Sequence, residues 1–351
     1  MLIINGVYGE GGGQILRTSL ALAAIQSRPI RIENIRAGRK NPGLAAQHLT
    51  AVRAAAMICD ANLAGDSLGS TTLIFEPRSQ TIPGIYEFDV SEAREGGSAG
   101  AATLVLQTVL PPLALAAEPS SVIVKGGTHV PWSPSFHYIR DVYLPMAAHL
   151  GLPATVELLA WGWYPAGEGT IKAVLPGQPW PTSGLTETRG VLKQIKGVAV
   201  ASSLPAHIAQ RMRDRAANLL EQASLPFTIE PQRVRSASPG AGIFLVAEYE
   251  HSLAGFTALG EIGKPAERVA EEAINDLTAF HHSNALLDKH LADQLILPQA
   301  LSGRAATLSV ERVSNHTLTN LWLVEQFLGP VAEINRDEGI IQFTQKDKVV
   351  V

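Results

Sequence analysis

The residues best suited to chemistry lie near the C-terminal end, where His316 precedes a long apolar segment. The stretch from Arg312 to Asn320 reads RVSNHTLTN. Ser314 or Asn315 can cap a helix there, which places His316 in the first turn. The partial positive charge at a helix start disfavours the protonated imidazole, and a neutral imidazole can act as a nucleophile. Because short motifs are weak by themselves, a capping-region histidine without chemistry is the alternative.

A glycine-rich turn at residues 9–14, with the sequence GEGGGQ, is the second candidate site. Bare backbone allows phosphate to approach closely, and Glu10 could hold a divalent metal. The motif is not a P-loop, because no Gly-Lys-Ser/Thr follows, and Gln14 stands where a dinucleotide fingerprint needs glycine. An ordinary turn between a strand and a helix is the alternative.

Basic side chains are concentrated between Gly11 and Ala56, where Glu33 is the only acid. Their local field can attract phosphate even though the net charge of the chain is −4. A solvated basic face is the alternative. The basic residues are Arg17, Arg28, Arg31, Arg36, Arg39, Lys40 and Arg53.

Two other kinds of site, a serine hydrolase site and a structural zinc site, are disfavoured. Residues 96–100, GGSAG, match the nucleophile elbow of serine hydrolases, but that motif needs a strand that runs directly into Ser98. Here the polar residues 91–95 follow the predicted strand Glu87–Val90. The histidines, His281 and His282 among them, do not have the spacing of a zinc site.

The composition fits a large folded protein of the cytoplasm. The chain has 351 residues, of which 46% are hydrophobic, enough for two domains or for one large domain with an insertion. Cys59 is the only cysteine, which fits a reducing compartment, and the N-terminus does not resemble a signal peptide. The apolar run Ala99–Ala117 is interrupted by Gln107 and Pro111-Pro112, and indicates a buried helix with a proline stop rather than a membrane span.

A β-α-β-α-β-β pattern occurs three times. In the first copy, the helix Ile15–Ile25 lies between the strands Leu2–Asn5 and Pro29–Ile35, and Asn41-Pro42 is the predicted start of the next helix. The second copy runs from about residue 87 to 174. The third contains a helix at about Ala285–Leu297, a strand, the His316 helix and two final strands.

An extra stretch separates the second and third copies. We predict an α/β (α+β) fold in which three βαβαββ units form a large domain, residues 1–184 and 281–351. Residues 185–280 are predicted to form a smaller βαββ-type inserted domain. Each repeat places a helix N-terminus behind a polar or glycine-rich turn, and such ends bind anions, so several can converge on one cleft.

The glycine-rich segment 9–17 and His316 with Thr319-Asn320 are two of eight segments along the chain. Together these eight segments resemble the RNA 3′-terminal phosphate cyclase family. They follow the family's order and lie outside the predicted insert. The matching segments are residues 9–17, 35–39, 42–44, 47–52, 104–111, 126–128 and 291–295, and His316 with Thr319-Asn320.

The resemblance implies ATP-dependent conversion of an RNA 3′-terminal phosphate to a 2′,3′-cyclic phosphate. His316 would attack the α-phosphate of ATP and form a covalent histidine–AMP. AMP would pass to the RNA 3′-phosphate, and the neighbouring 2′-hydroxyl would then displace it. The protein would be a nucleotidyl-transferring ligase of RNA processing that acts on RNA with a 3′-phosphate end, without a membrane partner, and a homodimer is possible.

The resemblance also assigns roles to particular residues. Glu10 would bind Mg or Mn, and phosphates would be bound by Arg17, Arg36, Arg39, Gln47 and His48. The nucleotide would be contacted by Gln107, Pro134, His290, Leu291, Ala292, Asp293 and Gln294. The chain departs from the family pattern at His290, where relatives have tyrosine, and at Trp161 and Glu168 in a glycine-rich signature.

Two further functions have sequence arguments. A cyclase-like scaffold of ribosome assembly shares the fold without the catalysis, and failure to bind ATP would favour it. An enolpyruvyl transferase-type enzyme reuses a related repeat, but it needs two comparable lobes, whereas this chain predicts one large body and one small insert.

Overall fold

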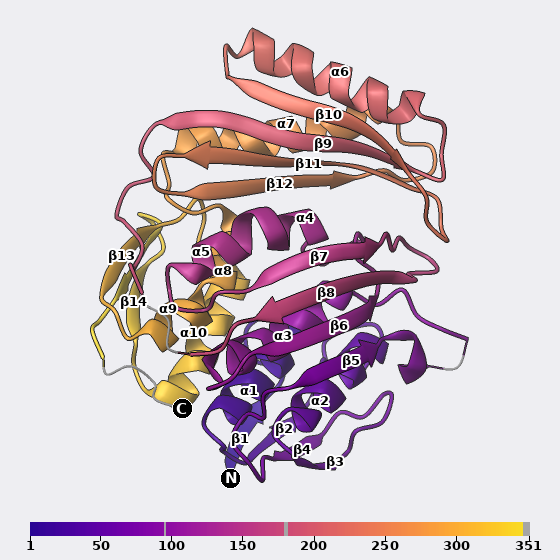
Figure 1. Ribbon diagram of the computed structural model, residues 1–351. Helices are drawn as coiled ribbons and strands as arrows, with labels where there is room; N and C mark the ends of the chain where they lie inside the picture. The colour runs from indigo at the N-terminus through magenta and orange to yellow at the C-terminus, as the bar shows by residue number, and fades with distance from the viewer. Residues whose placement is uncertain (95, 179–181, 347–351) are drawn as a thin grey trace.

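The computed structural model describes residues 1–94, 96–178 and 182–346. Figure 1 shows one sheet at the top, with α6 and α7 on its outer side, above a larger body that contains the remaining sheets. Glu95, which belongs to the polar stretch before Ser98, lies outside the described residues. Within the described part of the chain, no helix combines the length and apolar character needed to cross a membrane.

The first repeat forms a four-stranded sheet in the order β1-β2-β4-β3. β1 and β2 are parallel, so a helix must cross between them, whereas the other pairs are antiparallel. The elements are β1 (Leu2–Asn5), α1 (Gly13–Ile25), β2 (Ile30–Glu33), α2 (Ala46–Met57), β3 (Asn62–Ala64) and β4 (Leu73–Glu76).

The second repeat has the same topology, with strand order β5-β6-β8-β7 and one parallel pair, β5 with β6. A 3₁₀ turn at Ser91–Ala93 and a π-helical turn at Ile139–Tyr143 interrupt its regular elements. The others are β5 (Ile85–Asp89), α3 (Ala102–Leu115), β6 (Ser120–Gly126), α4 (Phe136–Tyr138), α5 (Leu144–Ala148), β7 (Thr155–Ala160) and β8 (Gly169–Leu175).

The third repeat is the most reduced. Its opening strand is represented by a single parallel bridge between Leu287 and Val310, and its sheet has the order β13-β15-β14. Its elements are α8 (Lys289–Gln294), α9 (Ile296–Ser302), β13 (Ala306–Ser309), α10 (Asn315–Leu328), β14 (Ala332–Asn335) and β15 (Ile340–Phe343). The predicted mixed α/β fold is therefore confirmed.

The small sheet has the order β10-β9-β11-β12 and its own hydrophobic core, which includes Ile195, Met212 and Phe280. It contains one strand that was not predicted, β12, because its sequence LAGFTAL has few β-branched residues. Division of the chain into independent domains at 184/185 and 280/281 stays a prediction. The elements are β9 (Leu192–Ser202), α6 (His207–Gln222), β10 (Phe227–Val234), β11 (Gly240–Tyr249), β12 (Leu253–Leu259) and α7 (Ala266–Ser283).

α1 is the central helix of the body. Ile15–Ile25 is buried apart from Arg17, and α1 packs against α2, α3 and α10. Because α1 begins directly after the glycine-rich turn, its contact with α10 places that turn beside His316.

The first helix prediction that was wrong concerns α2, which begins at Ala46 and not at Asn41-Pro42. The backbone N–H groups of Gly43 and Leu44 donate to Ile35 O and Ser70 O instead. A tertiary loop conformation has therefore replaced a locally favourable helix start.

The prolines of α3 also do not stop that helix, since it continues to Leu115. A proline removes one helical donor, but α3 is buried on nearly all sides, and this packing outweighs the loss. The helix predicted at Ala285–Leu297 starts only at Lys289 and is divided into α8 and α9. Residues before it are extended, because Leu286 N and Leu287 N donate to Ser309 O.

Candidate active site

The described residues enclose a cleft of about 870 Å³ between the body and β12 of the small sheet. Its lining comes from the glycine-rich turn, α1, α2, α3, the loop after β6, β12, α8 and α10. Leu291 and Ala292 do not line it, because their side chains pack in the main core. The other predicted site residues all do: Glu10, Arg17, Arg36, Arg39, Gln47, His48, Gln107, Pro134, His290, Asp293, Gln294 and His316.

His316 lies at the start of α10, where the hydroxyl of Ser314 caps the helix by accepting from Thr317 N at 3.1 Å. Its Nδ1 is 2.7 Å from Gln14 Oε1. An amide oxygen only accepts, so Nδ1 carries the hydrogen and Nε2 is the unprotonated nitrogen of the neutral ring. Burial lowers the pKa of His316, although Glu10 opposes this, and the lowered pKa favours the neutral ring.

Glu10 faces the free nitrogen of that ring. Its Oε2 lies 2.8 Å from His316 Nε2, and its Oε1 lies 3.7 Å from Arg39 Nη2. Despite the short distance, Oε2 is a buried oxygen that accepts no hydrogen bond. The backbone of Glu10 is held by the hydroxyl of Thr319, which accepts from Glu10 N at 3.3 Å.

A buried carboxylate oxygen without a hydrogen bond fits a divalent cation as a ligand. The residues that the structure describes contain no group of three or more His, Cys, Asp or Glu side chains that could hold a metal. The site therefore fits a metal that would take Glu10 as its protein ligand and phosphate oxygens of the substrate as further ligands. This arrangement is common for Mg²⁺.

Arg17 and His48 lie side by side, Arg17 as a cationic hydrogen-bond donor and His48 as a neutral one. Burial lowers the pKa of Arg17 to about 10, and Asp293 opposes this, so the guanidinium stays charged at neutral pH. His48 Nδ1 accepts from Ala45 N at 3.2 Å, which leaves Nε2–H as a donor. Burial, together with Arg17 and Arg36, lowers the pKa of His48 to about 3. A Cβ on Gly13 would collide with His48 Nε2, so glycine is needed for this close approach.

Arg36 and Gln47 have part of their hydrogen-bonding capacity used within the fold. Arg36 Nη1 donates to Gly43 O at 2.7 Å, and burial lowers the pKa of Arg36. Gln47 Oε1 accepts from Ala101 N at 2.8 Å, at the start of α3. The rest of the Arg36 fork and the amide N–H₂ of Gln47 can therefore still serve phosphate oxygens.

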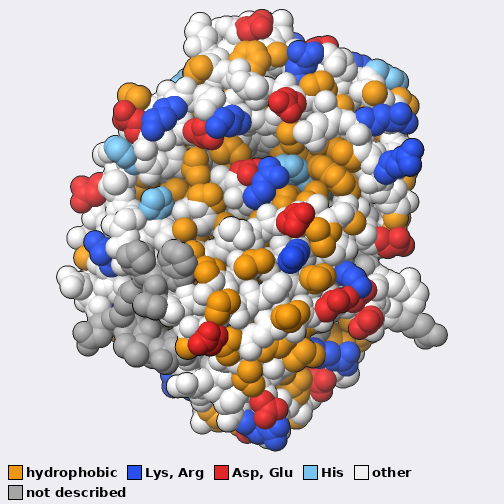
Figure 2. All heavy atoms as spheres, in the orientation of Figure 1, with side chains coloured by type: hydrophobic (Ala, Val, Ile, Leu, Met, Phe, Trp, Pro, Cys, Tyr) orange, Lys and Arg blue, Asp and Glu red, His pale blue; other side chains and the backbone are white. Residues whose placement is uncertain are grey.

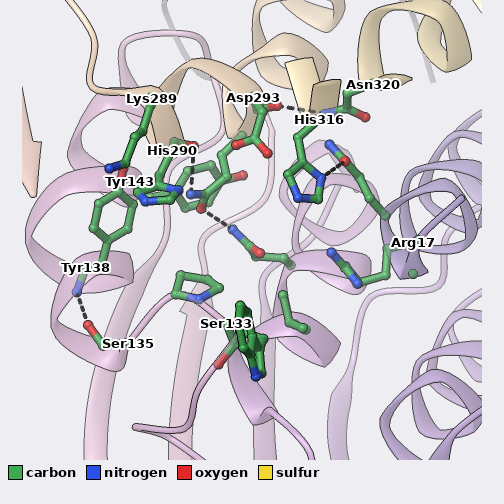
Figure 3. A pocket seen from close by; sticks show the side chains of 18 of the residues that line it. Arg17, Ser133, Ser135, Tyr138, Tyr143, Lys289, His290, Asp293, His316 and Asn320 are labelled. Carbon is green, nitrogen blue, oxygen red and sulfur yellow. Dashed lines mark hydrogen bonds between the residues drawn. The ribbon is translucent and has the colours of Figure 1, made fainter. Parts of the chain in front are cut away.

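The other end of the cleft is built on α8. Gln107 Nε2 donates to Gln294 Oε1 at 2.6 Å, and Gln294 Nε2 donates to His290 O at 2.9 Å. In Figure 3, His290 and Tyr143 lie at one end of the pocket, and Arg17 and His316 at the other. The pocket thus presents the rings of His290 and Tyr143 at one end, and a guanidinium beside the imidazole of His316 at the other.

Asp288 is a site-building residue that the sequence interpretation missed. This buried carboxylate accepts from Tyr138 Oη at 2.9 Å, from Gly255 N at 3.1 Å, and from the N–H groups of His290 and Leu291 at 2.9 Å each. It joins α4, β12 and α8. Its position before Lys-His-Leu-Ala-Asp-Gln is a capping signal that sequence reasoning could have used.

Asn320 was noted only as part of the family resemblance. Its Oδ1 accepts from the hydroxyl of Thr18 at 2.9 Å, and its Nδ2 donates to Asp293 O at 2.7 Å. Asn320 thereby fixes α10 to α1 and α8, the three helices that carry His316, Arg17 and Asp293.

Asp293 is another acidic side chain of the cleft. Part of its surface stays open to the cleft, but the surrounding protein raises its pKa to about 8, mainly by burial. Arg17 opposes this effect and Asp288 adds to it. At pH 7 the carboxyl group is therefore largely protonated and can donate a hydrogen bond.

We expect Asp293→Asn to stabilise the protein by an amount that grows from about pH 4 to about pH 8. The unfolded carboxyl group loses its proton near pH 4 and the folded one near pH 8, so the folded state binds more protons between these values and stability falls as pH rises. The neutral amide lacks this cost, which we put on the order of 5 kcal/mol at pH 8. Urea unfolding at pH 4 and pH 8 measures it. A variant that is less stable than wild type at pH 8 would show an ionised carboxylate paired with Arg17.

The two departures in the glycine-rich signature lie outside the cleft lining. Trp161 stacks on His129 with a centroid distance of 4.5 Å, and His129 also lies beside Trp163 and Phe244. Glu168 occupies the turn between β7 and β8 with a φ of 53°. Trp161 and His129 belong to the contact between the body and the small sheet.

The family model described as RNA 3′-terminal phosphate cyclase matches residues 8–334 of the chain. The chain belongs to the RNA 3′-terminal phosphate cyclase family. Several relatives bear the name RNA 3′-terminal phosphate cyclase. One from Methylococcus capsulatus is 54% identical over 93% of this chain and 91% of its own length. One from Nostoc punctiforme is 53% identical over 97% and 98%, and one from Pyrococcus abyssi is 40% identical over 97% and 96%.

Membership of this cyclase family confirms the expectation of an enzyme. The similarity covers the glycine-rich turn, the small sheet and α10 together, because the match runs from residue 8 to residue 334. The roles of the individual cleft residues are a separate question, which rests on the geometry above.

Proposed function

We propose that the protein is an ATP-dependent RNA 3′-terminal phosphate cyclase that acts through a covalent His316–AMP. The observation that carries this proposal is the 2.7 Å contact between His316 Nδ1 and Gln14 Oε1, which leaves Nε2 as a free nucleophile. Nε2 lies in a cleft that also contains Arg17, Arg36 and Arg39, the side chains suited to bind phosphates.

In the first step, the lone pair of His316 Nε2 attacks the α-phosphorus of ATP. The P–N bond forms, the P–O bond to the β-phosphate breaks, and pyrophosphate leaves. The ring becomes positively charged, and its Nδ1–H donates to Gln14 Oε1, which stabilises that charge. A divalent cation, Mg or Mn held by Glu10, would neutralise charge on the triphosphate when bound.

In the second step, an oxygen of the RNA 3′-phosphate attacks the phosphorus of AMP, the P–N bond breaks, and His316 returns to its neutral form. The vicinal 2′-hydroxyl then attacks the activated RNA phosphorus and loses its proton, AMP leaves, and the 2′,3′-cyclic phosphate remains. His48, Arg36 and Gln47 line the same cleft and would hold the RNA phosphate through their N–H groups.

The nucleotide would extend from His316 toward α8, where His290, Pro134, Asp293, Gln294 and Gln107 line the cleft. Leu291 and Ala292 could contribute only through their backbone, because their side chains are buried in the core. A cytoplasmic location and a homodimer stay predictions on which the mechanism does not depend.

The test is to incubate the protein with ATP, Mg²⁺ or Mn²⁺ and an RNA oligonucleotide that carries a 3′-phosphate. We expect a 2′,3′-cyclic phosphate, with one AMP and one pyrophosphate released per end. An otherwise identical RNA with a 2′-deoxy terminal nucleotide should stop as the RNA–adenylate, because the attacking hydroxyl is missing. An unchanged 3′-phosphate at high enzyme and ATP would contradict the proposal and favour the non-catalytic scaffold.

We expect Gln14→Leu to slow formation of His316–AMP by about 10²-fold, because the imidazole loses the acceptor that fixes its tautomer. Gln14→Glu keeps an oxygen at this position and should recover much of the rate. The KM for ATP should change little in either variant, since Gln14 acts on the histidine. A pre-steady-state measurement with labelled ATP gives both values, and equal rates for Leu and wild type would exclude this positioning role.

A further inference from the structure

Trp132 stands out at the rim of the cleft. It lies in the loop between β6 and α4, it lines the cleft, and the residue as a whole is 99% exposed. Leaving an indole in water forgoes the free energy that its burial would contribute. Almost none of this ring packs against the rest of the chain, so the fold itself gains little from a tryptophan here.

The backbone of Trp132 is also unusual. Its φ is 65°, in the left-handed region that bulky side chains rarely adopt. Such a conformation costs free energy and persists only where the surrounding structure imposes it, often at ligand sites.

The loop around Trp132 imposes that conformation. Ser133 Oγ donates to Val130 O at 3.0 Å, and Phe136 N donates to Thr128 O at 3.0 Å, which closes the loop at its base. Ser135 Oγ caps α4 and lies 3.2 Å from the hydroxyl of Thr257 on β12. The indole is therefore presented by a fixed loop rather than by a flexible one, which reduces the entropy lost on binding.

The position of the loop indicates what the indole meets. In Figure 3, Ser133 lies across the pocket from Asp293 and His316. The same cleft contains Arg17, Arg36 and Arg39. A flat aromatic surface beside a group of phosphate-binding cations suits a nucleobase joined to phosphate, because every base presents a face that can stack on an aromatic ring.

Under the proposed function, nucleobases from two molecules come near this cleft: the adenine of ATP and the bases at the RNA 3′ end. A mononucleotide can be enclosed, whereas an RNA chain must leave the cleft for solvent and therefore crosses its rim. An almost fully exposed ring at the rim therefore suits the RNA, which extends out of the cleft. We propose that Trp132 is the platform on which one of the last two bases of the RNA 3′ end stacks.

This inference rests on the proposed function and names a substrate-recognising residue within it. The first test compares Trp132→Ala, Trp132→Leu and Trp132→Phe. Loss of the stacking surface should raise the KM for RNA about ten-fold in the Ala and Leu variants, and Phe should recover most of it. Formation of His316–AMP from ATP should be unchanged in all three. Ile262→Ala removes an equally exposed apolar side chain outside the cleft lining and should behave as wild type.

The second test uses RNA in which the last or the penultimate nucleotide lacks its base. With wild-type protein, one of these substrates should show the same rise in KM as Trp132→Ala. With Trp132→Ala that substrate should show no further loss, because the interaction is already absent. The inference would be overturned if Trp132→Ala and the missing base each raised the KM for RNA independently. It would also be overturned if the Phe, Leu and Ala variants raised this KM equally.

Slower formation of His316–AMP in Trp132→Ala would overturn it as well, since Trp132 would then serve ATP. If wild-type protein failed to cyclise RNA at all, the proposed function would fail separately. Fluorescence anisotropy of the same variants with a labelled RNA 3′-phosphate would still decide whether Trp132 binds a base.

Discussion

Replacing His316 by alanine is expected to lower the rate of RNA cyclisation by about 10⁴-fold or more, because the covalent route to an activated phosphate is lost. A 3′-phosphate is a poor electrophile until it carries AMP, and the proposed mechanism delivers AMP through His316 Nε2. Single-turnover cyclisation of a 3′-phosphate RNA with ATP measures the effect.

A matched substrate separates chemistry from folding in this variant. RNA that already carries the 3′-adenylate needs only the final attack by its own 2′-hydroxyl, so His316→Ala should still cyclise it. His149→Ala, which alters an exposed histidine that contacts Ser183, should behave as wild type on both substrates. Retention of more than a tenth of wild-type activity by His316→Ala on 3′-phosphate RNA would exclude His316 as the nucleophile.

Replacing Asp288 by alanine should reduce the free energy of unfolding by about 4 kcal/mol, because several buried donors lose their acceptor at once. The donors are Tyr138 Oη, Gly255 N and the two N–H groups at the start of α8. Asp288→Asn should also destabilise the protein, since an amide N–H₂ replaces one carboxylate oxygen and then faces N–H and O–H donors. Urea unfolding at pH 7 measures both variants.

Asp276 supplies the control for this prediction. Its carboxylate is 59% exposed and lies 3.1 Å from Lys289 Nζ, in the same part of the fold. An exposed ion pair contributes little, so Asp276→Ala should cost less than about 1 kcal/mol. Equal losses for the Asp276 and Asp288 variants would contradict the structural role of the buried carboxylate.

Local sequence signals were sufficient where the structure depends on local interactions. The Ser314 cap predicts the start of α10, and the glycine-rich turn predicts the start of α1. The repeated order of strands and helices predicts the first two sheets, because each copy pairs its own strands. Most of the site residues that the family resemblance implies line one cleft.

The long-range contacts that hold the cleft residues together could not be predicted in this way. Gln14 and His316 are 302 residues apart in sequence and meet only because α1 packs against α10. Asp288 joins Tyr138 and Gly255 from two other elements, and Gly13 gives space to His48. Pairing of this kind is decided by tertiary packing, which periodicity and capping signals do not encode.

The failed helix starts have the same cause. Asn41-Pro42 is a favourable local start, but Gly43 and Leu44 donate to strand and loop carbonyls, and α2 begins later. β12 was missed because its own composition does not indicate a strand. Its hydrogen bonds to β11 make it one.

The central claim, a covalent bond between His316 and AMP, is tested most directly by incubating the protein with α-labelled ATP and Mg²⁺ or Mn²⁺ in the absence of RNA, followed by a denaturing gel. We predict label on the wild-type protein that acid removes, as expected of a P–N bond, no label on His316→Ala, and release of the label as AMP when 3′-phosphate RNA is added. Label that persists on His316→Ala, or wild-type protein that remains unlabelled at high ATP, would contradict the claim.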